Sequence, residues 1–133
     1  MKPGYIYVLT HPSNPDLYKV GVTIRDPKLR LAQHNSDFTK AAGRVVQETG
    51  QEWVIKEFHP VEDPYWAEKT FWSKIPQSVI PYRGGIEVEI MTWEEVGVGL
   101  AAAKLAGARP QTSAVPVYEI AYNVTVKKRL VGR

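Results

Sequence analysis

Apolar and polar residues alternate along residues 4–10 and again along residues 17–23. A period of two predicts a β-strand in each segment. The segment between them reads HPSNPD, and its prolines, asparagine and aspartate favour a turn. We therefore predict a β-hairpin in which Tyr5, Tyr7 and Lys19 share one face. The opposite face is apolar on both strands and carries Ile6, Val8, Tyr18, Val20 and Val22.

Two Asp-Pro pairs mark the starts of two predicted helices. Aspartate is a favourable N-cap and proline fits the first helical position, so the pair at residues 26–27 predicts a helix to about residue 35. The same pair at residues 63–64 predicts a helix through Ile75. Residues 50–58 alternate and form a third predicted strand. Residues 36–51 are polar and are predicted to form a loop with a short helical turn at most.

The C-terminal third of the chain contains further strand and helix signals. Gly84 and Gly85 predict a turn into another alternating strand. Thr92 and Glu95 have the spacing of a capping box, which predicts a helix to about Ala106. A linker then leads to the alternating sequence VYEIAYNVTV, a predicted final strand, and to the basic tail KKRLVGR.

Together these elements predict an α+β fold. Its centre is a small antiparallel β-sheet flanked by helices, followed by a C-terminal helix and strand extension. We expect residues 1–95 to form one domain and residues 96–133 to form the extension, packed on the same domain.

Composition narrows the class of protein. A chain of 133 residues, 44% hydrophobic and 23% charged, has the size and polarity of one soluble domain. No apolar run reaches the roughly 20 residues that span a bilayer, and the start MKPGYIYVL is predicted to be a strand rather than a signal peptide. We therefore expect a cytoplasmic protein. The chain has no cysteine, which excludes disulfides, a thiol nucleophile and a thiolate metal site.

Charge is distributed unevenly along the chain. Residues 1–44 carry seven lysines and arginines against three aspartates, and residues 96–133 carry six against one glutamate. Residues 45–95 are acidic, with ten carboxylates against four cations. Two basic segments of this kind could follow a phosphate backbone. The alternative is that these charges solvate an ordinary surface.

Some of the polar residues have the chemistry of phosphodiester hydrolysis. Arg30 and His34 are four residues apart, so they share one face of the first predicted helix. Glu68 lies beside the buried apolar stripe of the second predicted helix. Hydrolysis needs a proton acceptor, cations for the developing charge and a group that stabilises the leaving oxygen. A divalent metal held by one carboxylate can serve the last role. Tyr7 or Tyr5, Lys19, Arg30, His34 and Glu68 provide each of these groups.

The order of short motifs resembles the GIY-YIG nuclease superfamily. The closest similarity is to the branch typified by the bacteriophage T5 Orf172 DNA-binding domain and its meiotically up-regulated relative. The matching segments are GYIYVL at residues 4–9, KVG at residues 19–21 and RDPKLRL at residues 25–31, followed by Glu68 on a later helix. The resemblance covers about residues 4–75, and it suggests a bacterial or phage origin.

The resemblance implies a role for each matching residue. Tyr7 would activate or position the attacking water, and Arg30 would hold the scissile phosphate. Lys19 stands where most of the superfamily has a tyrosine, a departure that the Orf172-like branch shares. His34 matches a histidine found in several members. Glu68 matches the single glutamate that binds one Mg²⁺ or Mn²⁺ ion.

The predicted function is therefore a metal-dependent endonuclease that acts on DNA, with double-stranded DNA as the expected substrate. Two alternatives stay open: a catalytically inactive DNA-binding module on the same fold, and a protein-interaction domain that uses Trp53, Trp66, Trp72 and Trp93. Each candidate also has an ordinary structural explanation as a strand, surface or ion-pair residue. The predicted DNA contacts outside the catalytic set are Arg25, Lys28, Arg44, Lys127, Lys128 and Arg129.

Overall fold

The computed structural model describes residues 2–75, 80–81 and 88–108. In chain order, the elements of this part are β1 (Gly4–His11), β2 (Asn14–Thr23), α1 (Pro27–Ser36), α2 (Ala41–Thr49), β3 (Val54–Val61), α3 (Pro64–Ser73), β4 (Ile80–Pro81), β5 (Glu89–Ile90) and α4 (Trp93–Gly107). The turn predicted at Gly84 and Gly85 lies outside the described residues, as do the final predicted strand and the basic tail with Lys127, Lys128 and Arg129.

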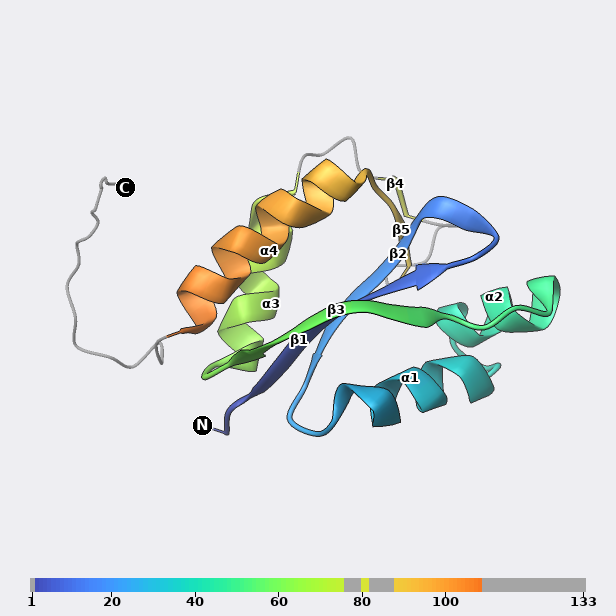
Figure 1. Cartoon of the computed structure of the whole chain (residues 1–133), viewed down its shortest axis with the longest axis horizontal. Coiled ribbons are helices and arrows are strands. Elements are labelled where there is room, and N and C mark those ends of the chain that lie inside the picture. Colours follow the sequence, from blue (N-terminus) through green and yellow to red (C-terminus); the bar gives the residue numbers. More distant parts are fainter. Residues whose placement is uncertain (1, 76–79, 82–87, 109–133) are drawn as a thin grey trace.

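A five-stranded antiparallel sheet forms the centre of the fold, in the order β3-β1-β2-β5-β4 (Figure 1). β1 pairs with both β2 and β3, so that Tyr7 lies opposite Gly21 on one side and Phe58 on the other. The predicted α+β class and the predicted hairpin are confirmed. The turn is shorter than predicted, because β1 extends to His11 and β2 already begins at Asn14.

The outer edge of β2 is only partly covered. β5 pairs with β2 at Leu17 and Tyr18, and its register ends there. Beyond these two residues, from Lys19 to Thr23, no strand of the described chain pairs with this edge of β2. Within the described residues, this segment of β2 therefore has a strand partner on one side only, which is β1.

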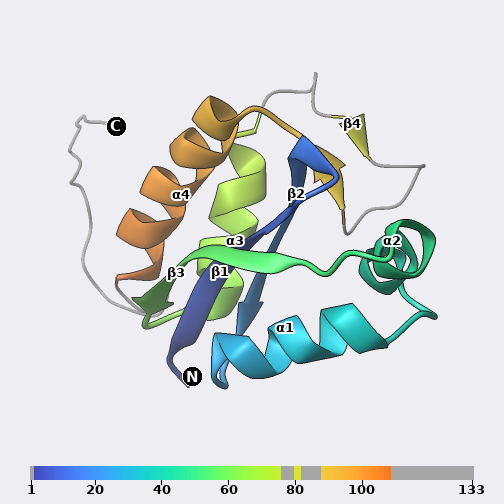
Figure 2. The same cartoon turned by 45° about the vertical axis from the view of Figure 1, so that its right-hand side comes forward.

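Helices cover both faces of the sheet. Figure 1 and Figure 2 show α3 and α4 side by side on one face and α1 and α2 on the other. The core under α3 and α4 contains Ile6, Val8, Tyr18, Val20 and Phe71, among others. The core under α2 contains Tyr7, Leu9, Leu17, Val45 and Trp53, among others. The prediction of a single apolar hairpin face is thus incomplete, because the face that carries Tyr7 is also packed.

α2 corrects the predicted loop at residues 36–51. Its buried residues include Ala42, Val45 and Val46, whose i, i+3, i+4 spacing places them along one side of the helix. The indole nitrogen of Trp53 donates a hydrogen bond to the carbonyl of Ala42 at 2.9 Å. The helix ends at Gly50, whose φ of 71° is the left-handed conformation that glycine adopts without strain. The prediction of a loop for residues 36–51 is therefore wrong at residues 41–49, where an amphipathic helix packs on Trp53.

The predicted helix starts are confirmed. The side chain of Asp26 accepts a hydrogen bond from the backbone of Lys28, and Asp63 accepts one from the backbone of Trp66. Thr92 and Glu95 form the predicted capping box at the start of α4. The ends differ slightly: α3 ends at Ser73 rather than residue 75, and α4 includes Gly107.

α4 packs into the same core as the sheet. Val96, Leu100 and Ala103 are buried against α3 and the strands. The domain boundary predicted between residues 95 and 96 falls in the first turn of this helix. The close approach of α4 to α3 depends on Gly99, because a Cβ added there would lie 2.5 Å from Cε2 of Phe71.

This contact predicts opposite effects for two neighbouring glycines. Gly99→Ala is expected to lower the free energy of unfolding by about 1–3 kcal/mol, because it overpacks the α3–α4 contact. Gly97 faces open space, so Gly97→Ala should raise the free energy of unfolding by about 0.5–1 kcal/mol through helix propensity. Urea unfolding of both variants measures the difference. A Gly99→Ala variant as stable as Gly97→Ala would contradict the packing argument.

Candidate functional site

A buried hydrogen bond joins β1 to α1. The hydroxyl of Tyr7 lies 2.9 Å from Nε2 of His34, and these residues are only 1% and 6% exposed. The Tyr7 ring reaches His34 by crossing Gly21: a Cβ at this position would lie 2.6 Å from the phenol oxygen. A glycine at residue 21 therefore leaves room for the phenol, and strand pairing places Tyr7 directly opposite it.

The environment of His34 keeps its imidazole neutral at physiological pH. Burial lowers the pKa of His34 from 6.5 to about 4, and the positive charges of Lys19 and Arg30 contribute to the shift. In the tautomer with its proton on Nδ1, Nε2 accepts a hydrogen bond from the Tyr7 hydroxyl. In the other tautomer, Nε2 donates to the phenol oxygen. The first arrangement gives Tyr7 a neutral partner that can receive its proton.

Cations surround an open pocket of about 540 Å³ beside this hydrogen bond. Lys19, Arg30 and Lys40 line it, together with the carboxylate of Asp37. The guanidinium of Arg30 is partly exposed and donates to Oε1 of Gln33 at 2.6 Å. Among the described residues, three cations and a single carboxylate line this pocket. Such a lining favours an anion whose oxygens can accept several hydrogen bonds, such as a phosphodiester.

Lys19 connects this pocket to two carboxylates on other elements. Its side chain is 9% exposed and starts at the open edge of β2. Burial raises the pKa of Glu68 on α3 and of Glu89 on β5, and the positive charge of Lys19 opposes both shifts. Glu68 is half-buried but does not line the pocket that contains Arg30. Lys19 therefore lines the pocket together with Arg30 and also interacts electrostatically with Glu68.

Glu89 is a site residue that the sequence analysis missed. It is only 7% exposed and lies opposite Tyr18, the residue before Lys19. Its position follows from the pairing of β5 with β2, which joins residues that are far apart in the chain. The alternating sequence EVEI marked a strand but could not indicate which strand it would join.

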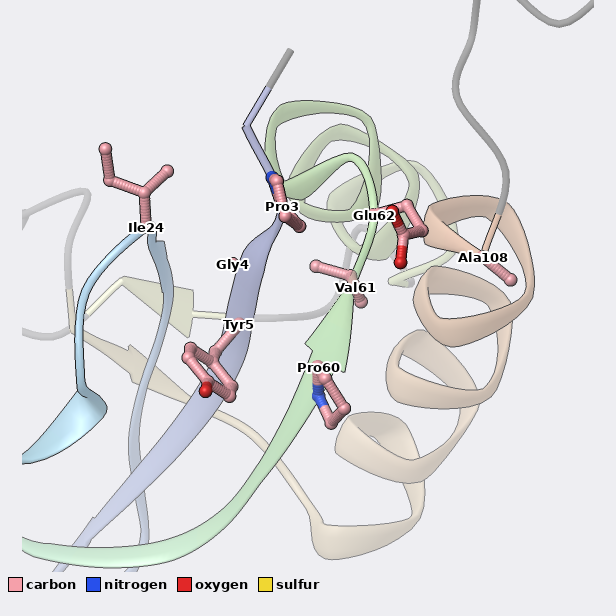
Figure 3. A pocket seen from close by; sticks show the side chains of 8 residues that line it. All are labelled: Pro3, Gly4, Tyr5, Ile24, Pro60, Val61, Glu62 and Ala108. Carbon is pink, nitrogen blue, oxygen red and sulfur yellow. The ribbon is translucent and has the colours of Figure 1, made fainter.

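The other candidates lie away from this group. Tyr5 packs edge-on against Phe58, with 5.8 Å between the centres of the two rings. It also lines a separate pocket of about 470 Å³ with Ile24 and Pro60 (Figure 3). Arg25 and Lys28 are exposed around the start of α1. The structure thus brings Tyr7, Lys19, Arg30 and His34 together, with Glu68 on the far side of Lys19, and separates Tyr5 from them.

Arg44 is exposed on α2 and donates a hydrogen bond to the backbone carbonyl of Thr39 at 3.0 Å. Its guanidinium is therefore partly used in closing the turn between α1 and α2. The role predicted for it in binding DNA stays a prediction, as do the roles of Arg25 and Lys28.

Comparison with known families identifies the architecture. The model of the T5orf172 domain matches residues 4–90, from β1 to the end of β5. The chain belongs to the T5orf172 domain family. The predicted Orf172-like branch is therefore confirmed, and the match contains the whole group from Tyr7 to Glu89. No curated protein and no solved structure matches the chain.

Membership of the T5orf172 family supports a nuclease or DNA-binding domain and does not by itself specify a mechanism or a metal. Within the described ranges, no three His, Cys, Asp or Glu side chains form a group that could hold a metal ion. The same residues include no helix with the length and apolar content of a membrane span.

The lowered pKa of His34 predicts a loss of stability in acid. Above pH 6.5 the ring is neutral in both the folded and the unfolded chain, so the shift has no effect there. Below this value the unfolded chain binds a proton that the folded one does not, and stability falls until the pH reaches about 4. The expected contribution is about 3 kcal/mol.

Urea unfolding between pH 7 and pH 4 measures this loss. His34→Gln, which has no titrating ring, is the reference for the slope with pH. Proton NMR of the His34 ring gives the pKa directly. A ring that titrates near 6.5 would show that His34 is solvated, and the expected loss of stability between pH 6.5 and pH 4 would then be absent.

Proposed function

We propose that this T5orf172 domain is a GIY-YIG-type endonuclease that hydrolyses phosphodiester bonds of double-stranded DNA with one divalent metal ion. The observation that carries the proposal is the buried hydrogen bond between Tyr7 and His34, beside a pocket lined by Lys19 and Arg30. A packing role alone does not require a neutral imidazole, a phenol and two cations at one place.

Tyr7 and His34 provide a path for the proton of the attacking water. As the water oxygen bonds to phosphorus, the water proton passes to the Tyr7 oxygen. The bond to the leaving oxygen breaks, and that oxygen takes a proton from solvent. The phenol proton passes to Nε2 of His34 over their 2.9 Å hydrogen bond. The imidazole is neutral at pH 7, so Nε2 has a lone pair for this proton, although its lowered pKa of about 4 makes it a weaker base than a solvated histidine.

Arg30 and Lys19 stabilise the negative charge of the transition state. Arg30 is partly exposed and can present two N–H groups to the phosphate oxygens, which Lys19 approaches as a compact charge. The low exposure of Lys19 strengthens this interaction, because few water molecules compete for its ammonium group. Both cations also favour DNA over an uncharged ligand.

Glu68 is the residue that would hold the Mg²⁺ or Mn²⁺ ion. Magnesium sites on phosphate substrates use one or two carboxylates and keep several waters, so a single half-buried glutamate fits. A bound ion supplies Lewis-acid stabilisation of the leaving oxygen. Burial raises the pKa of Glu68, and the nearby positive charge of Lys19 opposes this rise and favours the ionised form that a metal ion requires.

One observation favours a second candidate, a DNA-binding module that does not cut. Glu68 lies outside the pocket that contains Arg30, so phosphate binding does not need the acid. The protein-interaction alternative has less support. Trp53 is 2% exposed and Trp66 and Trp72 are half-buried, whereas Trp93, at 39%, contributes more to the surface.

A plasmid assay separates cutting from binding. Supercoiled plasmid is incubated with the protein in Mg²⁺, Mn²⁺ or EDTA, and nicked and linear products are measured. We expect cleavage with either metal, none in EDTA and little with Arg30→Ala. Lys104→Ala on α4, purified in the same way, is the control for loss of an ordinary surface cation and should cut normally. A wild-type protein that binds DNA but cuts with neither metal supports the binding module instead.

A further inference from the structure

An exposed aromatic group lies on α3 next to Glu68. Tyr65 is 64% exposed, one of the largest exposures of an aromatic or apolar side chain in the described residues. Nζ of Lys69 lies 6.0 Å from the centre of the Tyr65 ring and 5.8 Å from that of Trp66. We call Tyr65, Trp66 and Lys69 the α3 platform. It combines open aromatic surface with a positive charge.

The α3 platform is close to the candidate site. Tyr65 precedes Glu68 by three residues, so both side chains lie on the same side of the helix. The start of α3 also meets the end of β2: a Cβ on Gly4 would contact both Pro64 of α3 and Ile24 just after β2. The α3 platform therefore begins close to the end of β2, the strand that carries Lys19.

This combination fits an unpaired nucleotide. Single-stranded nucleic acid is bound by aromatic rings that stack on its bases and by cations that contact its backbone. Lys69 is exposed, and no carboxylate of the described chain forms an ion pair with it, so its charge is available to a phosphate. In a fully paired duplex the bases stack on each other and offer no free face to Tyr65.

We propose that Tyr65 stacks on an unpaired nucleotide beside the cut site, so that the protein prefers duplex DNA with a single-stranded branch over fully paired DNA. Lys69 contacts the phosphate next to that nucleotide. This inference rests on the proposed function, since it requires DNA at Lys19 and Glu68, and it names the substrate class within it.

Binding to two matched DNA substrates tests the inference. A labelled duplex and the same duplex with a single-stranded flap are titrated with protein in EDTA, and fluorescence anisotropy gives each Kd. The wild type should bind the flap substrate more tightly. Tyr65→Ala should weaken flap binding by about 5- to 100-fold and leave duplex binding unchanged. Tyr65→Phe keeps the ring and should retain the preference.

Phe58→Ala is the matched control, because Phe58 is also an exposed ring, 45% exposed, but lies on β3 at the opposite side of β1 from β2. It should leave both Kd values unchanged. Equal flap affinity for Tyr65→Ala and wild type overturns the inference, while duplex binding and cleavage still support the nuclease. Equal losses on both substrates overturn the preference for an unpaired nucleotide. A wild type that binds neither substrate overturns the inference together with the proposed function.

Discussion

Glu68→Gln is expected to lower the rate of metal-dependent DNA cleavage by at least about 1,000-fold, the factor that corresponds to several kcal/mol of lost charge stabilisation. The amide has nearly the size of the carboxylate, so α3 should pack as before. DNA affinity should stay within about threefold or increase, because the change removes a negative charge beside the phosphate. Initial rates on plasmid DNA and a Kd in EDTA measure the two effects separately.

The same carboxylate predicts an acid limit to cleavage. A protonated Glu68 cannot hold a metal ion, and burial raises its pKa above that of an ordinary glutamate. Cleavage at a fixed Mg²⁺ concentration should therefore fall, as the pH is lowered, at a higher pH than the usual glutamate pKa implies. Added Mg²⁺ should move this limit to lower pH, since metal and proton compete for the same oxygens.

Glu62→Gln provides the control for Glu68→Gln. Glu62 is an exposed glutamate between β3 and α3, it lines the other pocket with Tyr5, and its loss should leave cleavage unchanged (Figure 3). If Glu68→Gln cuts as fast as the wild type, the metal is held elsewhere or is not needed. Glu89, buried on the other side of Lys19, would then be the next acid to replace.

The parts of the fold that depend on residues close together in the sequence could be predicted from the sequence alone. The β1–β2 hairpin follows from alternation, and the starts of α1 and α3 follow from Asp26 and Asp63 as N-caps. The prediction missed α2, because the polar residues of segment 36–51 and its glycines favoured a loop. Ala42, Val45 and Val46 nevertheless have the i, i+3, i+4 spacing of an amphipathic helix. Their packing against Trp53, which follows the helix, completes the core on that face of the sheet.

Some features of the site likewise follow from residues that are close in the sequence, and others depend on residues that only the fold brings together. Arg30 and His34 share a face of α1 because they are four residues apart, and both contribute to one pocket. The Tyr7–His34 hydrogen bond needs the room above Gly21, a feature that appears only when β1 and β2 are paired. Glu89 reaches Lys19 through β5, and Tyr5 leaves the group because it packs on Phe58.

Tyr7→Phe tests the proton path itself. Phenylalanine keeps the ring that crosses Gly21 and removes only the hydroxyl, so the β1–α1 packing should persist. Loss of a general acid–base group typically costs about 100- to 10,000-fold, and we expect a reduction of cleavage in this range with DNA affinity unchanged. Stability should fall by about 1–3 kcal/mol, because buried His34 loses its partner.

The double variant Tyr7→Phe with His34→Gln distinguishes a proton path from two independent contributions. If the water proton passes from Tyr7 to His34, removal of either residue interrupts the same step, and the double variant should cut about as slowly as the slower single variant. Multiplied losses would mean that each residue acts on the transition state separately. A Tyr7→Phe variant with wild-type cleavage would instead assign the water to another base, and the buried hydrogen bond would then serve only to hold α1 against the sheet.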